Sequence, residues 1–193
     1  INPFYKIFSN PVETVIQPSQ GGLAQISFQN AKGAYVGGVE FEARTNLAFL
    51  KKGSSVLENI TFFGNYTLIT SLVDQSNIES IADDVKSRPL QGQSPYVFNL
   101  GVQYNTLKDF NITLTANQYG RRIAFVGQEN KFQVWEAPRL VMDFSISKTF
   151  NKKFNLKGTI GDLIAEDLIF YYDLDRNGAF DKNRDETFEK YRR

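Results

Sequence analysis

The chain has 193 residues, of which 41% are hydrophobic and 14% aromatic, with a formal net charge of +1 and neither cysteine nor histidine. This composition excludes thiol nucleophiles, disulfides, Cys/His zinc sites and Ser-His-Asp catalysis. The near-neutral charge removes the main electrostatic argument for binding nucleic acid. No stretch approaches the roughly 18 uncharged apolar residues of a membrane helix. Transmembrane β-strands stay compatible with the composition, because they turn only alternate residues to lipid.

Period-2 alternation of apolar and polar residues is the main signal along the chain, and it predicts antiparallel strands. The start, residues 1–4, lacks an initiating Met and indicates an internal cut or a processed end. A weaker strand is expected within residues 11–16, and an apolar run covers residues 23–28. The clear alternating segments follow at residues 34–44, 57–73, 96–104, 110–117, 140–147 and 154–160. The sequence therefore predicts an all-β wall of about seven strands.

The connections between these segments fall into two classes. Residues 106–109 and 151–153 form tight polar turns, whereas residues 70–95, 120–138 and 165–191 form long polar connections. Short turns on one side and long loops on the other are typical of an up-and-down transmembrane barrel. Aromatic residues near the ends of the apolar rows fit membrane-interface girdles. These are Tyr66, Tyr96, Tyr104, Phe110, Tyr119, Phe150 and Phe154. The alternative is that these aromatics form the core of a soluble sheet.

Several segments resemble a known family. Residues 28–44, 64–69, 88–101, 120–123, 138–139 and 144–148 are similar to the C-terminal barrel region of TonB-dependent outer-membrane receptors, especially those of Bacteroidetes. The resemblance spans nearly the whole chain. Its most specific piece is Leu-Gln-Gly-Gln-Ser-Pro-Tyr at residues 90–96.

The resemblance implies that residues 1–193 are a C-terminal segment of a large plugged antiparallel barrel of the 22-stranded class, truncated at both ends. It implies active uptake of a scarce nutrient (a siderophore, a vitamin, an oligosaccharide or a peptide) across the bacterial outer membrane. The expected partners are outer-membrane lipid, an N-terminal plug, the rest of the barrel, the TonB energy-coupling protein and a small-molecule or glycan ligand. Nucleic acid is not expected, and no enzymatic activity is expected.

A possible calcium loop is the clearest local motif. Asp173, Asp175, Asn177 and Asp181 place oxygen ligands at loop positions 1, 3, 5 and 9, with Gly178 at position 6. Position 12 is an arginine, so the bidentate Glu of an EF-hand is missing. The alternative is an Asp/Asn/Gly-rich turn at a loop tip. No other cofactor is expected.

A possible ligand contact lies in the long connection of residues 120–138. Trp135 could stack on a ligand, with Arg121 and Arg122 close to it in the sequence. The alternative is that Trp135 is a buried anchor of the loop. Glu40 and Glu42 lie on the polar face of one strand, where lumen groups are a simpler interpretation than a catalytic carboxylate pair.

Two other classes of protein stay open on the residues alone. One is a small outer-membrane barrel of about eight strands with a structural or adhesion role. The other is a soluble β-sandwich or lipocalin-like binding module, which would fold in buffer without detergent.

Overall fold

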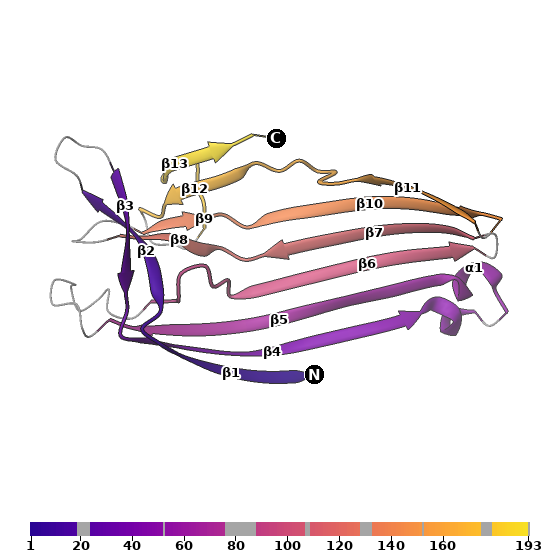
Figure 1. The fold of residues 1–193 in the computed structure, drawn as a ribbon, viewed down its shortest axis with the longest axis horizontal. Coiled ribbons are helices and arrows are strands. Elements are labelled where there is room, and N and C mark those ends of the chain that lie inside the picture. Colours follow the sequence, from indigo (N-terminus) through magenta and orange to yellow (C-terminus); the bar gives the residue numbers. More distant parts are fainter. Residues whose placement is uncertain are drawn as a thin grey trace.

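The computed structural model describes residues 1–18, 24–51, 53–75, 88–106, 109–127, 133–151, 153–174 and 179–192. Two β-sheets contain most of these residues: a long, gently curved sheet and a smaller one at one of its ends (Figure 1). Among the helices in the described ranges, none is long and apolar enough to cross a membrane.

The long sheet, here called the wall sheet, contains seven antiparallel strands. In spatial order they are β1 (Asn2–Ser9), β4 (Gly33–Asn46), β5 (Ile60–Asp74), β6 (Tyr96–Thr106), β7 (Phe110–Tyr119), β10 (Arg139–Phe150) and β11 (Phe154–Ile160). All six clearly alternating segments of the sequence are therefore confirmed as strands of one sheet. The seventh strand, β1, was not predicted.

The strand register gives the wall sheet one apolar and one polar face. On the apolar face Leu100 of β6 lies opposite Ala116 of β7, and the next pair on that face is Val102 with Leu114. On the polar face Asn99 lies opposite Asn117. Because side chains alternate along every strand, a shift of one residue would turn all of them over. The register thus keeps each alternating row on a single face.

The smaller sheet, here called the loop sheet, is built from the long connections. Its order is β13 (Glu186–Tyr191), β12 (Leu168–Tyr172), β9 (Val134–Glu136), β8 (Arg122–Gly127), β2 (Val12–Pro18) and β3 (Ala24–Asn30). It lies at the end of the wall sheet opposite to the short turns (Figure 1). β2 and β8 pair in parallel, and Val15, Ile123 and Val126 form a buried cluster on which Trp135 packs. The connection between β1 and β4 and the connection between β7 and β10 therefore share one small core.

The loop sheet is the main departure from the sequence prediction. Residues 120–138 and 165–191 were expected as polar connections, but they contain β8, β9, β12 and β13. β9 has only three residues, so no alternation could reveal it. The strands expected within residues 11–16 and at residues 23–28 are confirmed as β2 and β3, although they belong to the loop sheet.

Smaller differences lie at the strand ends. A 3-10 turn (η1, Leu47–Leu50) and a short helix (α1, Ser55–Glu58) join β4 to β5, so β5 begins at Ile60 and not at residue 57.

Among the aromatic residues predicted for the membrane interface, Tyr66 and Tyr96 stack on the apolar face with ring centroids 6.4 Å apart. Tyr119 was expected in the same girdle. It lies on the polar face instead, where it pairs with Arg139 of β10.

Candidate functional site

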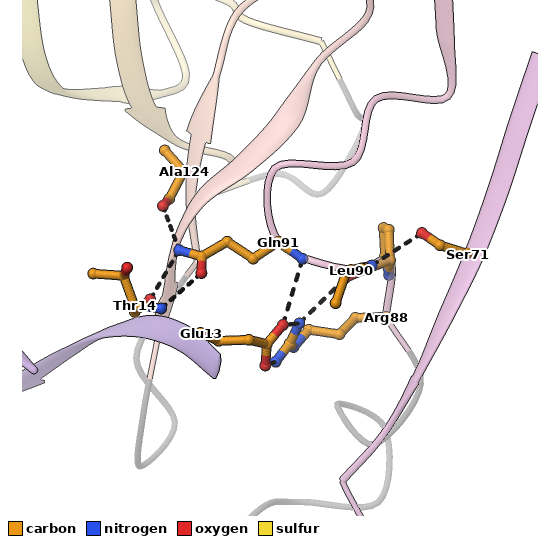
Figure 2. Close-up of polar contacts among 8 residues, drawn as sticks. Glu13, Thr14, Ser71, Arg88, Leu90, Gln91 and Ala124 are labelled. Carbon is orange, nitrogen blue, oxygen red and sulfur yellow. Dashed lines mark hydrogen bonds and ion pairs between the residues drawn. The ribbon is translucent and has the colours of Figure 1, made fainter. Parts of the chain in front are cut away.

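Residues 88–95 connect the wall sheet to the loop sheet. Arg88 and Glu13 of β2 form an ion pair in which both side chains are 4% exposed, and Arg88 Nη1 lies 2.8 Å from Glu13 Oε1. Two residues on, the backbone N–H of Leu90 donates to the Ser71 hydroxyl on β5 at 3.0 Å. Figure 2 shows that these contacts reach in opposite directions, Arg88 toward β2 and Leu90 toward β5. This segment is therefore anchored to both sheets.

Gln91 joins the two strands that pair in parallel. Its side-chain oxygen accepts the backbone N–H of Thr14 at 2.6 Å, and its side-chain nitrogen donates to the Thr14 carbonyl at 3.0 Å and the Ala124 carbonyl at 2.6 Å (Figure 2). The next residue, Gly92, has φ +74°, a conformation that glycine adopts without strain. The backbone N–H of Gly92 donates to the Ile123 carbonyl at 2.9 Å. The Gln-Gly pair thus extends the hydrogen bonding of β2 and β8.

A pocket of about 250 Å³ lies beside this segment. Ile69, Thr70 and Ser71 of β5 line one part of it, and Pro89, Gln93, Ser94 and Pro95 line another. Arg121 and Trp135 from the loop region complete the described lining. Ile69 and Ser71 alternate with the exposed Leu68 and Leu72, so the pocket lies on the polar side of the wall sheet. It occupies the junction of the two sheets, at the end where the long connections gather.

Trp135 and Arg121, the predicted ligand contacts, lie against each other, whereas their contact with a ligand stays a prediction. The Arg121 guanidinium lies over the indole ring, 4.3 Å from its centroid. Arg121 Nη1 also lies 2.8 Å from a carboxylate oxygen of Asp173. The rest of Trp135 packs on the buried cluster of Val15, Ile123 and Val126. Trp135 is therefore an anchor of the loop sheet as well as a lining residue, and Arg121 is held between a ring and a carboxylate.

Tyr171 of β12 lies beside this group and is fully buried. Burial raises the pKa of the Tyr171 phenol, the charges of Asp173 and Asp185 raise it further, and Arg121 opposes them. Asp173, 2.8 Å from Arg121 Nη1, is the carboxylate that balances the Arg121 charge.

Arg122 points elsewhere. It makes two hydrogen bonds to the Glu136 carboxylate, at 2.7 and 3.0 Å, and its guanidinium lies 4.2 Å from the ring centroid of Tyr119. Tyr119 donates its hydroxyl hydrogen to the same carboxylate. Burial lowers the pKa of Arg122, but the hydrogen bonds and charge of Glu136 outweigh it and the net direction is up. The structure separates Arg122 from the Trp135 and Arg121 pair and gives it no place in the described lining of the pocket.

The predicted calcium loop is only partly described. Asp175 and Asn177 lie outside the described residues, and the carboxylate of Asp173 is paired with Arg121. The Asp185 carboxylate accepts the backbone N–H groups of Leu174 at 3.1 Å and Asp181 at 2.8 Å, which joins the two ends of the loop. Within the described ranges, no group of three acidic side chains is arranged to hold a metal. Calcium binding therefore stays a prediction.

The sequence did not assign roles to Glu13, Ser71, Arg88, Gln91 or Gln93. Arg88 and Gln91 belong to the segment that carries the family resemblance, but their partners are more than 70 positions away in the chain. No local pattern connects residues at that separation. An alignment in which Glu13 and Arg88 change together is the signal that would have revealed the pair.

Comparisons with known proteins agree with the fold. A family model described as TonB dependent receptor-like, beta-barrel matches residues 1–163. No curated protein and no solved structure matches the chain. The matched region includes the whole wall sheet and every described residue that lines the pocket, whereas β12 and β13 lie beyond it. The chain therefore belongs to the β-barrel family of TonB-dependent receptors.

Proposed function

We propose that this chain forms part of the barrel wall of an outer-membrane receptor, of the type found in Bacteroidetes, that takes up a scarce nutrient with energy supplied through TonB. The two-faced wall sheet is the observation that carries the proposal. Exposed apolar side chains, such as Leu100, Leu114 and Ile160, share its apolar face. An apolar outer band and a polar interior are what a barrel in a lipid bilayer requires.

We further propose that the pocket at the sheet junction contacts the external ligand. It lies at the end of the wall sheet where the long connections gather, and long loops of outer-membrane barrels face the exterior. Its lining combines an aromatic ring with a small number of polar groups, as ligand sites commonly do. The plug, the remaining strands and TonB are the partners that complete such a receptor.

Cysteine labelling of intact cells tests whether the end of the wall sheet with the pocket faces the cell exterior. These 193 residues contain no cysteine, so each substitution adds one labelling site to this part of the receptor, and the receptor without the substitution is the background control. Gln93→Cys in the pocket should react with a membrane-impermeant maleimide on intact bacteria that express the receptor. Lys153→Cys, in a short turn at the opposite end, should react only after permeabilisation. Labelling of Lys153→Cys alone on intact cells, or recovery of both variants in the soluble fraction, would contradict the proposal.

A further inference from the structure

The end of the wall sheet that lies away from the pocket is rich in lysine. Three turns lie there, at residues 47–59, 107–109 and 151–153 (Figure 1). Together these turns contain five lysines and two acidic residues. In the part of the chain that the structure describes, no ion pair involves Lys51 or Lys153 of the turns, or Lys148 near the end of β10. This end of the wall sheet therefore carries an excess of positive charge.

Lys148 lies on the apolar face of the wall sheet. In the strand register it is opposite Phe110 of β7 and Leu156 of β11, whose rows form that face. Its Nζ lies 5.3 Å from the centroid of the Phe150 ring. Phe150 is 44% exposed and Leu156 is 70% exposed. A positive charge thus lies among exposed apolar side chains at the point where the apolar face ends.

The other end of the apolar face also has a charge, but that charge is balanced. Asp74, the last residue of β5, lies 3.6 Å from Lys32 Nζ through its carboxylate. On the apolar rows of the described wall strands, Asp74 and Lys148 are the charged residues. Lys148 has no acidic partner among the described residues, so its counterion comes from outside this chain segment.

The turn between β4 and β5 places a second lysine beside exposed apolar side chains. Phe49 and Leu50 of η1 are 68% and 63% exposed, and Val56 of α1 is 53% exposed. Lys51 directly follows η1 and is exposed as well. The turn thus combines the apolar and basic residues that are typical of segments lying in a membrane interface.

Hydrogen bonds within the turn fix its shape. The Asn46 side chain accepts the backbone N–H of Ala48 at 3.3 Å at the start of η1. Between the two helical segments, the Glu58 carboxylate accepts the backbone N–H of Gly53 at 3.2 Å. Because the turn is already ordered, binding through its exposed side chains costs little further loop entropy.

From these observations we infer that the short-turn end of the wall sheet binds the phosphate groups of anionic phospholipids, with Lys148 and Lys51 as the cationic contacts. A lysine stem lies along apolar surface while its ammonium group reaches the headgroups. Each lysine close to an anionic lipid surface strengthens the attraction about fivefold. Phe49, Leu50 and Val56 lie at the boundary between headgroups and acyl chains. The inference rests on the proposed barrel wall and adds the class of lipid that this end of it selects.

A phospholipid fits this surface better than a free anion does. A free phosphate ion would contact the lysines alone and leave the apolar side chains around them in water. A phospholipid pairs its phosphate with Lys148 and covers Phe150 and Leu156 with its acyl chains, on the same face as the rest of the apolar rows. The surface therefore matches a molecule with an anionic head and an apolar tail.

Fluorescence quenching beside Lys148 tests the inference in the whole receptor. Leu156→Cys places an NBD label opposite Lys148 on the apolar face. The receptor is reconstituted in phosphatidylcholine nanodiscs that contain a small fraction of either nitroxide-labelled phosphatidylglycerol or nitroxide-labelled phosphatidylcholine. At equal mole fraction, the anionic lipid should quench the label at least threefold more strongly. Lys148→Gln should remove this difference, whereas Lys148→Arg should keep it within twofold.

Lys6→Gln is the matched control. Lys6 also lies near a phenylalanine ring, 5.7 Å from the centroid of Phe4, but it is on the polar face of the wall sheet. Its replacement should change the preference for the anionic lipid by less than 1.5-fold. A label at Val56→Cys reports on the turn in the same way, and there Lys51→Gln should lower the preference at least threefold.

The outcomes separate this inference from the proposed function. Equal quenching by the two lipids would overturn the inference and leave the barrel wall in place. A preference for the anionic lipid that persists in both Lys148→Gln and Lys51→Gln would also overturn the inference, because other parts of the receptor would then select the lipid. Quenching of the label at position 156 by neither lipid would overturn the barrel wall as well.

Discussion

Individual residues at the junction of the two sheets are charged or polar and yet buried. Glu13 and Arg88 are each 4% exposed at the side chain, in contrast to Lys32 and Asp74, whose ion pair leaves them 61% and 39% exposed. Exposed ion pairs contribute about 0–1 kcal/mol, whereas removing one partner of a buried pair costs about 3–5 kcal/mol. The junction therefore depends on the buried pair far more than on the exposed one.

Glu13→Gln tests this dependence at the scale of one residue. The substitution keeps the shape of the side chain but leaves the Arg88 charge buried without its carboxylate, so it should weaken the docking of β2 by about 3 kcal/mol. Hydrogen exchange of the β2 amides, measured by mass spectrometry, should then be more than 100-fold faster. Glu42→Gln, at an exposed position on β4, is the matched control and should change β2 exchange by less than threefold. Equal exchange in both variants would show that the pair does not hold the junction.

The strands differ in how well the sequence predicts them. β5, β6, β7 and β10 have ten or more residues and one exposed face, so their alternation is long enough to predict type and register. β8, β9 and β12 are short and contain residues that are fully buried, such as Ile123, Val134 and Tyr171. A short buried strand has no polar row to alternate with. These strands form because distant loops meet, which local sequence does not encode.

The candidate site also combines features that the sequence predicts with features that it does not. Trp135 and Arg121 line one pocket, and their role as ligand contacts stays a prediction, whereas Arg122, next in the sequence, belongs to a different ion pair. Arg121 precedes β8, which begins at Arg122, and the two side chains have different partners, Asp173 for Arg121 and Glu136 for Arg122. The pairing of Arg121 with Asp173 joins two loops 52 positions apart and is visible only in the structure.

The loop sheet should lose stability at high pH through Tyr171. Its pKa is raised above 10.0 in the folded protein, mainly by burial, while an unfolded chain ionises near the ordinary value. The stabilisation is therefore complete below pH 10 and is lost as the pH rises through the folded pKa. Urea unfolding followed by Trp135 fluorescence should show a steeper fall of the midpoint between pH 9 and about 11 in the wild type than in Tyr171→Phe. Parallel pH profiles would contradict the assignment of this effect to Tyr171.

The whole molecule consists of the two-faced wall sheet and the smaller loop sheet at one of its ends. The described parts of three long connections join in one sheet, because β12 pairs with β9, β9 with β8 and β8 with β2, and residues of β2, β8 and β9 share a core. The proposed ligand contact and the packing of the loops therefore involve the same residue, Trp135. In the proposed receptor the pocket is bordered by the ordered loop sheet, so less loop entropy is lost when a ligand binds.

In the proposed receptor, the apolar face of the wall sheet contacts lipid and the polar face contacts water. Spin labels on single cysteines along β7, from residue 110 to residue 119, test it most directly in a lipid bilayer. Labels at positions 112, 114 and 116 should be most accessible to oxygen, which partitions into lipid, and labels at 113, 115 and 117 to a water-soluble nickel chelate. That period-2 alternation is the predicted result. Equal access of the nickel chelate to both rows would show that neither face lies against lipid, and would contradict the account.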